Sequence, residues 1–282
     1  MKKSIYFLLA IAALAFAGCK KQDTLAEPAG TRVVTITAAL ESATTKVTTG
    51  SAVGKFAWEK GDKIGVWTGE AFVPFTLDDS SEGQVAGKFS GTLPEGKAIE
   101  FAVYPYSEGD TYADGVYTSN YNAGWGAGDF KPCLHMYATK ADQNTLKFQH
   151  LCAYVLVTIK NVRADCKYAY LESPGGSMFL VGGQQADLTA EYPKFTSVAQ
   201  EQVFVPLPAD HSNIVFYAPI MPGSWNDNKP FKIKFFQEGD WDHEYGKNAL
   251  SDEPVINHVG ALQTGGAINR GEIVVLPEIV FE

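Results

Sequence analysis

The sequence predicts an all-β protein, and three observations lead to this fold class. Short runs rich in Val, Ile, Thr, Tyr and Phe recur along the chain, and this composition is typical of strands. Clusters of Gly, Asn, Asp, Ser and Pro separate these runs at intervals typical of β-sandwiches. The apolar spacing of amphipathic helices is nearly absent. A chain of 282 residues suits two modest domains or one large sandwich, and we expect two sandwich domains in tandem.

The chain begins with the features of a bacterial lipoprotein signal, which we place at residues 1–18. Lys2 and Lys3 precede an apolar run that is too short to span a bilayer, and small residues lead into Cys19. This junction resembles a lipobox, whose cysteine sulfur accepts a diacylglycerol. We therefore expect Cys19 to be lipidated and residues 19–31 to be a polar tether. An ordinary secretory signal with an incidental cysteine is the alternative.

The N-terminal domain is expected over residues 32–160, with its first strand at Val33–Leu40. Apolar residues alternate in that strand, so that one side carries four of them: Val34, Ile36, Ala38 and Leu40. Residues 56–67 are predicted to form a hairpin that turns just before Asp62, where Gly61 can adopt a positive φ. Further strands are predicted at residues 72–77, 87–91, 99–106 and 145–150.

Two segments of this half differ from ordinary strands. Residues 107–131 are rich in Gly, Tyr, Asp and Asn without a clear period, which predicts a long exposed loop of the kind that carries function. Residues 151–159 are apolar on both faces, which predicts a central strand. His150 adjoins that strand and is expected to be a hydrogen-bonded core histidine. The polar turn at residues 161–165 places the domain boundary near Lys160.

The C-terminal domain is expected over residues 161–282. Strands are predicted in it at residues 168–171, 178–181, 202–205, 214–219, 231–236 and 272–281. In the last strand one face carries four apolar residues, with Pro277 interrupting: Ile273, Val275, Ile279 and Phe281. A terminal strand of this kind has one free end, although it can equally be an ordinary member of its own sheet.

Composition and motifs exclude several function classes. The chain has 23 Lys and Arg against 32 Asp and Glu and no basic stripe, which argues against nucleic acid as a partner. No nucleophile elbow, paired C-x-x-C or calcium-loop spacing occurs, so we expect no enzyme, no metal site and no cofactor. With Cys19 lipidated, an odd number of cysteines remains, and the sequence leaves their pairing open: Cys133, Cys152 and Cys166.

Six segments, in their order and spacing, resemble the fimbrillin family, whose members are the subunits of type V pili. They are Val33–Leu40 followed by Thr44-Thr45-Lys46; Trp58-Glu59-Lys60-Gly61-Asp62-Lys63-Ile64; Tyr104-Pro105-Tyr106; Phe148-Gln149-His150-Leu151-Cys152-Ala153; Tyr217-Ala218-Pro219-Ile220-Met221-Pro222-Gly223; and Ile268-Asn269-Arg270-Gly271-Glu272. The resemblance covers most of the chain after Cys19.

This resemblance implies Greek-key sandwiches, the first transthyretin-like, in a lipoprotein carried to the outer membrane and cell surface. A protease then cuts after a basic residue beyond the first strand, and the C-terminal strand of another pilin subunit fills the groove left behind. Here the cut is expected at Lys46, because a cut at Arg32 would leave the strand in place. The displaced strand is then the one whose apolar side carries Val34, Ile36, Ala38 and Leu40. The donor strand is the one whose apolar face carries Ile273, Val275, Ile279 and Phe281. The best-known members are cut after arginine, so lysine leaves an uncut anchor as an alternative to a stalk or tip subunit.

The alternative from another class is a monomeric surface lipoprotein that binds glycans. Four aromatic residues of the 107–131 loop are of the kind that stacks on sugar rings: Tyr112, Tyr117, Tyr121 and Trp125. The same rings can instead pack the loop onto the sandwich. An adhesive tip that contacts a host or bacterial surface protein or glycan would combine both functions. Polymerisation distinguishes a pilus subunit from a glycan binder, because a glycan binder should stay monomeric after protease treatment.

Overall fold

The computed structural model describes residues 30–41, 44–45, 56–120, 134–139, 145–172, 179–200, 202–224, 231–237, 241–242, 247–248, 256–260, 267–276 and 278–280. Over these residues every element is a strand apart from the 3₁₀ turn η1 (Asp79–Ser81), which confirms the all-β class. Within the same residues, no helix is long and apolar enough to cross a membrane. Several predicted features lie outside the described residues: Cys19, Lys46, Tyr121, Trp125, Cys133 and Phe281.

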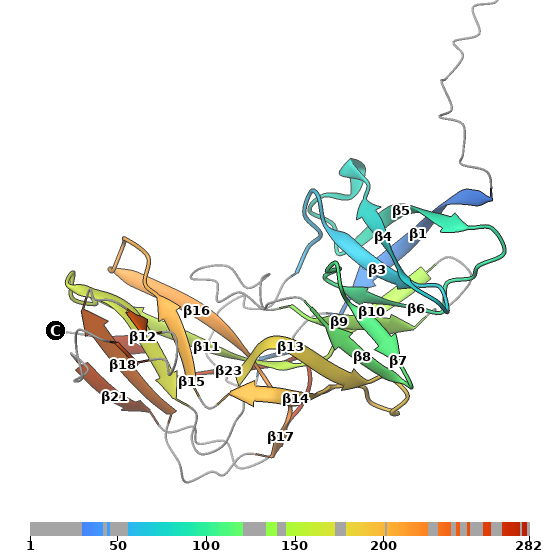
Figure 1. Cartoon of the computed structure of the whole chain (residues 1–282). Coiled ribbons are helices and arrows are strands. Elements are labelled where there is room, and N and C mark those ends of the chain that lie inside the picture. Colours follow the sequence, from blue (N-terminus) through green and yellow to red (C-terminus); the bar gives the residue numbers. More distant parts are fainter. Residues whose placement is uncertain are drawn as a thin grey trace, which may run out of the picture.

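The first sheet closes into a barrel at one end of the molecule (Figure 1). Its strands follow the order β1-β10-β9-β6-β3-β4-β5 and return to β1. Their bounds are β1 (Thr31–Leu40), β3 (Lys63–Trp67), β4 (Phe72–Leu77), β5 (Ala86–Pro94), β6 (Phe101–Tyr104), β9 (Met136–Thr139) and β10 (Thr145–His150). A closed barrel was not expected from the sequence, and closure leaves this sheet without free edges.

The strand expected at Val33–Leu40 is β1, which begins two residues earlier, at Thr31. It runs antiparallel to β5 and parallel to β10, so both of its edges are paired. Ile36, Ala38 and Leu40 are buried and Val34 packs partly buried against the same core, whereas Val33 on the other side is 60% exposed. The alternation in the sequence thus separates the core side of the strand from its solvent side.

The hairpin predicted over residues 56–67 is wrong, although its turn forms. Gly61 has φ +85° and the Asp62 amide donates to the Glu59 carbonyl at 3.0 Å. However, β3 pairs with β4 and β6, while the Trp58 amide donates to the Gln84 carbonyl at 2.9 Å. The reason is that Trp58 is buried in the barrel core and its backbone bonds Gly83 and Gln84, while both edges of β3 are taken by β4 and β6.

The second sheet has the order β2-β23-β11-β16-β13-β8-β7, with β14 paired to β13 and β24 paired to β11. Its strands are β2 (Thr44–Thr45), β7 (Thr111–Ala113), β8 (Val116–Ser119), β11 (Ala153–Lys160), β13 (Phe179–Asp187), β14 (Phe195–Gln200), β16 (Asn213–Ile220), β23 (Glu272–Val275) and β24 (Ile279–Val280). β11 is the central strand predicted at residues 151–159. Tyr154 packs in the barrel core, which is the buried cluster around Trp58, Phe89 and Phe148, while Val155 packs in a second core around Phe216 and Ala169.

A third sheet lies at the opposite end of the molecule from the barrel (Figure 1). Its order is β15-β12-β18-β21, formed by β12 (Cys166–Glu172), β15 (Gln202–Pro206), β18 (Phe231–Gln237) and β21 (Ile256–Gly260). Two small pairs complete the described strands: β17 (Gly223–Ser224) with β22 (Ala267–Ile268), and β19 (Trp241–Asp242) with β20 (Lys247–Asn248). Ala169 of β12 and Phe216 of β16 share the second core, so the third sheet packs on the second.

The segment predicted as a long loop, residues 107–131, contains a β-hairpin. β7 and β8 pair across Asp114-Gly115, which both have positive φ, and β8 continues into the second sheet through β13. An Asp-Gly pair is the strongest local hairpin signal, and the aromatic and polar composition around it concealed this one. β7 and β8 precede Lys160 and β11 ends at it, but all three strands share a sheet with later ones. The division into two domains near Lys160 stays a prediction.

Replacing Gly91 by alanine is expected to destabilise the barrel by about 1–3 kcal/mol, the usual cost of overpacking. Gly91 lies in β5 opposite Val34, and a Cβ atom there would lie 2.2 Å from a ring carbon of the fully buried Phe75. Chemical denaturation measures the effect. Gly223→Ala is the control, because a Cβ at Gly223 meets nothing within 4 Å. Equal unfolding midpoints for the two variants would contradict the packing argument.

Candidate functional site

The first candidate site is the position that β1 occupies in the barrel. β1 forms nine residue pairs with β5, from Thr31↔Pro94 to Ala39↔Ala86, and four pairs with β10, from Thr37↔Thr145 to Leu40↔Phe148. Its residues precede a gap in the described chain at 42–43, and β2 follows. Of the predicted displaced residues, Ile36, Ala38 and Leu40 face the barrel core. A barrel without β1 would therefore have two unpaired edges and an open core.

Trp58 holds β1 from inside the barrel. Its Nε1 donates to the Ala38 carbonyl at 3.0 Å, and the whole side chain is buried. The ring packs edge-to-face against three aromatic rings, with centroid distances of 4.7 Å to Phe89, 5.1 Å to Tyr104 and 5.9 Å to Phe148. The backbone of β1 is thus hydrogen-bonded at Ala38 to a side chain buried in the barrel.

A hydrogen-bonded junction fixes the end of β1. The Glu41 amide donates to the Phe148 carbonyl at 3.0 Å, and the His150 amide donates to Glu41 Oε2 at 3.2 Å. The His150 ring joins the Glu41 carbonyl through Nε2 at 3.2 Å and the Tyr154 hydroxyl through Nδ1 at 2.7 Å. A carbonyl can only accept, so Nε2 carries the proton and Nδ1 accepts from Tyr154. The expectation that His150 is a hydrogen-bonded core residue is confirmed.

The neutral form of His150 makes this junction pH-dependent. Burial lowers the pKa of His150 from 6.5 to about 4, and the nearby Arg270 acts in the same direction, whereas the hydrogen bond that the ring donates to the Glu41 carbonyl acts against this shift. As the pH falls, His150 takes up a proton in the unfolded chain before it does so in the folded chain. The contribution of neutral His150 to stability is therefore fully present above pH 6.5. It falls as pH drops toward 4, by up to about 3 kcal/mol.

We expect His150→Asn to flatten the unfolding free energy between pH 6.5 and 4, measured by denaturation at each pH. His211→Asn is the matched control, because His211 is only half-buried and its ring bonds the Arg163 carbonyl at 2.9 Å, far from the barrel junction in the chain. A His150→Asn profile as steep as that of the control would contradict the assignment.

The predicted donor strand lies inside the second sheet. β23 runs parallel to β11 on one side, with Tyr154↔Ile273 through Leu156↔Val275, and parallel to β2 on the other. Ile273 is fully buried in the barrel core and Val275 packs against it. Ile279 packs in the second core instead, together with Val274. The single apolar face expected for residues 273–281 is therefore not continuous, because β23 ends at Val275 and β24 begins only at Ile279.

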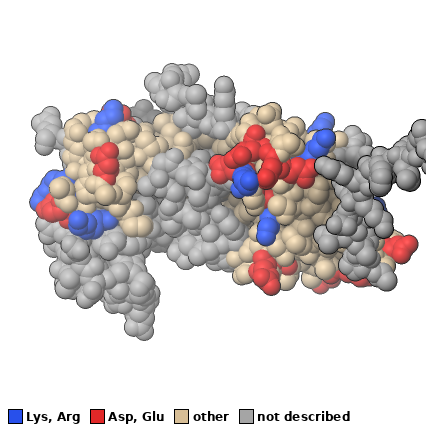
Figure 2. Space-filling view, turned by 90° about the horizontal axis from the view of Figure 1, so that it is seen from above, with Lys and Arg blue, Asp and Glu red and all other residues tan. Residues whose placement is uncertain are grey.

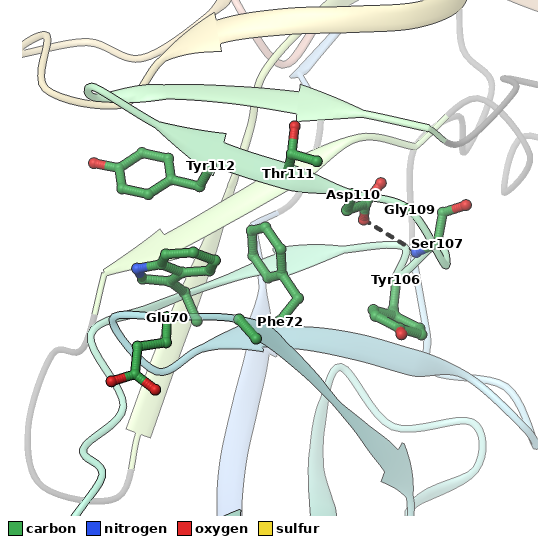
Figure 3. Close-up of a pocket in the computed structure, with 10 residues that line it drawn as sticks. Glu70, Phe72, Tyr106, Ser107, Gly109, Asp110, Thr111 and Tyr112 are labelled. Carbon is green, nitrogen blue, oxygen red and sulfur yellow. Dashed lines mark hydrogen bonds between the residues drawn. The ribbon is translucent and has the colours of Figure 1, made fainter.

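A second candidate site is a pocket of about 370 Å³ beside the start of β7. Figure 3 shows Tyr112 and Phe72 on opposite sides of it and Tyr106 and Ser107 at its end. Glu70, Asp110 and Thr111 line the pocket together with four aromatic residues: Trp67, Phe72, Tyr106 and Tyr112. The Glu70 carboxylate forms an ion pair with Lys97. The sequence pointed only to Tyr112 here, because Trp67 and Phe72 come from β3 and β4, far from the loop in the chain, and Tyr106 lies just before the loop begins.

Asp110 organises the loop at this pocket. Its carboxylate accepts from the Ser107 amide at 3.0 Å, the Asn120 amide at 2.8 Å and the Tyr117 hydroxyl at 3.3 Å. Burial raises the pKa of Asp110, and the three hydrogen bonds act against that shift. Tyr117 is 2% exposed, and burial together with the Asp110 charge raises its pKa well above 10. Its ring is therefore part of the core and cannot stack on a sugar.

The remaining residues considered from the sequence are the cysteines, candidate metal ligands, Arg32 and the surface charges. Cys152 and Cys166 are free, buried thiols, and burial raises the pKa of Cys152 to about 12. Within the described residues, no group of three His, Cys, Asp or Glu side chains could hold a metal ion. Arg32 lies in β1 and donates to the Lys97 carbonyl at 3.0 Å. On the face shown in Figure 2, the basic side chains are scattered among acidic ones.

Comparison with known proteins gives only weak likeness to solved structures, two of which are described here. No known family model matches the sequence, and no curated protein matches it. A crystal structure of a candidate cell adhesion protein from Bacteroides ovatus has 12% identity and a TM-score of 0.49, over 89% of this chain and 92% of that one. The major pilin of Streptococcus pyogenes has 11% identity and a TM-score of 0.19, over 88% and 99% of the two chains. Scores below 0.5 assign neither a fold nor a function to this chain.

Proposed function

We propose that this chain is a structural subunit of a cell-surface fimbrium that assembles by strand exchange after proteolysis. The observation that supports the proposal is the position of β1. This strand is the first in the barrel, it is paired along both edges, and its apolar side lies in the core. The barrel can therefore lose β1 from the chain terminus without a break in any other strand.

The slot left by β1 would favour another strand of the same pattern. β5 and β10 would each present unpaired backbone groups, which attract an incoming strand. Side chains at the positions of Ile36 and Leu40 would each gain about 1.5–3 kcal/mol on full burial. The proposed occupant is the C-terminal strand of a neighbouring subunit, in which Ile273 and Val275 have the same spacing as Ile36 and Ala38.

We place the proteolytic cut after Lys46. A protease needs extended backbone that is free of its own sheet, and Arg32 does not offer this because it is paired with Leu93 inside β1. A cut after Lys46 would release β1 and β2 together. The proposal includes export as a lipoprotein with lipid on Cys19, location at the outer membrane and cell surface, and other pilin subunits as partners.

The test compares intact and cut protein. Intact chain should stay monomeric, and cutting should produce fibres visible by electron microscopy, with Val47 as the new N-terminus. Lys46→Gln should prevent both the cut and the fibres. A synthetic peptide of residues 30–41 should stop fibre growth, whereas the same peptide with Ile36→Asp and Ala38→Asp should not. Cut protein that has released residues 30–46 and remains monomeric would overturn the proposal.

Glycan binding is the second candidate function, and the aromatic pocket favours it. Tyr106 and Tyr112 are half-buried beside Glu70 and Thr111, so rings and hydrogen-bonding groups lie at one pocket, as sugar sites require. Tyr106→Ala should then abolish binding to a glycan array. Tyr192→Ala is the control, because Tyr192 is 66% exposed and does not line the pocket. No binding by the intact chain would exclude this function for the pocket.

A further inference from the structure

The two strands of the proposed exchange are joined in the uncut chain. β2 is separated from the end of β1 by only three residues, and it pairs with β23 through Thr44↔Glu272 and Thr45↔Ile273. β2 is the end strand of the second sheet, so β23 has a neighbour on each side only while β2 is present. The N-terminal segment thus covers the strand that is proposed to leave.

We propose that the N-terminal segment formed by β1 and β2 controls both ends of the subunit at once. β1 fills the barrel and β2 covers the edge of β23, so a single cut beyond Thr45 opens the acceptor slot and uncovers the donor strand. The inference rests on the proposed function, whose two strands it links. An uncut subunit would then be unable to accept a strand and unable to donate one.

Removal of β2 turns β23 into an edge strand. β23 would keep its pairing with β11, from Tyr154↔Ile273 to Leu156↔Val275, and the bond from the Leu276 amide to the Leu156 carbonyl at 2.9 Å. Its other row of backbone groups would face solvent or a new strand. Edge strands with fewer buried hydrogen bonds open at lower free energy, which is the first step of any withdrawal.

A second contact links the same elements at the start of β23. The Gly271 amide donates to the Cys152 carbonyl at 2.8 Å, and a Cβ at Gly271 would lie 3.1 Å from the His150 ring. That ring is held by the Glu41 carbonyl, one residue past β1. When β1 leaves, Glu41 leaves with it, and the ring beside Gly271 loses that partner. Gly271, the residue before β23, therefore lies beside a ring that the N-terminal segment helps to hold.

The inference is tested first without proteolysis, in the full chain. Thr44→Pro/Thr45→Pro removes the amide hydrogens of β2, and Thr44→Ala/Thr45→Ala keeps them as the matched control. Hydrogen exchange is measured over residues 272–276 and over β5. We expect exchange at 272–276 to rise at least about tenfold in the proline variant, while β5 stays protected and the alanine variant matches the parent. Equal exchange at 272–276 in both variants would overturn the inference.

If the proline variant loses protection in β5 as well, a second measurement tests whether β2 protects β23. The chain is cut beyond Thr45, its N-terminal segment is removed in mild denaturant, and synthetic peptides are added back. Residues 30–41 should restore protection of β5 but not of 272–276, whereas residues 30–45 should restore both. Equal protection of 272–276 by the two peptides would overturn the inference.

Fibre formation separates this inference from the proposed function. Cut chain that exchanges rapidly at 272–276 but never forms fibres would leave the control by β2 in place and refute strand exchange. Fibres from cut chain, together with unchanged exchange at 272–276 in the monomer, would support strand exchange and refute the control by β2.

Discussion

Replacing Trp58 by alanine is expected to lower the free energy of unfolding by about 3–5 kcal/mol, the usual cost of deleting a large buried aromatic side chain. Trp58 is fully buried and contacts Phe89, Tyr104 and Phe148 edge-to-face. Its removal would leave a cavity in the barrel core and the Ala38 carbonyl without the Trp58 donor. Loss of that hydrogen bond would weaken the hold on β1 in particular.

Denaturation in guanidinium chloride measures the loss, with hydrogen exchange of β1 as the local readout. Trp58→Phe is the control, because it keeps an aromatic ring but removes the Nε1 donor, and it should cost about 1–3 kcal/mol. In both variants β1 should exchange faster than β11. An alanine variant that loses less than the phenylalanine variant would show that the ring packing described here does not stabilise the barrel.

Ala38→Asp is expected to cost at least about 4 kcal/mol, because it places a carboxylate in the barrel interior. Ala38 is fully buried, and its backbone neighbours on either side are Gly87 of β5 and Leu146 of β10. No Lys or Arg is among the buried residues that the structure describes, so the new charge would have no lysine or arginine partner inside the barrel. The expected result is a chain that no longer retains β1 and that self-associates through the open slot.

The matched control is Val33→Asp in the same strand. Val33 points to solvent, so the same change should stay within about 0.5 kcal/mol of the parent. Size-exclusion chromatography and the unfolding midpoint give the comparison. If both variants behaved like the parent, β1 would not be buried in the barrel as described.

The parts of the fold that the sequence predicts correctly are those that depend on patterns between neighbouring residues of the chain. The alternation from Val34 to Leu40 identifies a strand and its buried side, because side chains of a strand alternate between two faces whatever its partners are. The doubly apolar run at residues 151–159 likewise predicts a strand covered on both faces, and β11 is one. Both inferences use only neighbours in the chain.

Predictions that depended on which strands pair, or on which distant side chains meet, were less successful. The hairpin at residues 56–67 failed because the local pattern cannot say that β3 pairs with β4 and that Trp58 enters the core. The β7–β8 hairpin was missed because the Asp114-Gly115 signal lies in a polar, aromatic segment that resembles a loop. The aromatic pocket could not be assembled, since Trp67 and Tyr112 are brought together only by folding.

The sequence by itself determined the strand composition, the alternation of β1 and the buried character of β11. It also contains the signal-like N-terminus and the segments that resemble fimbrillins. Only the tertiary structure decided that β1 closes a barrel between β5 and β10, and that β2 lies against β23. The physical reason is that the side-chain period of a strand records which face is buried, whereas its neighbours depend on pairing between residues far apart in the chain.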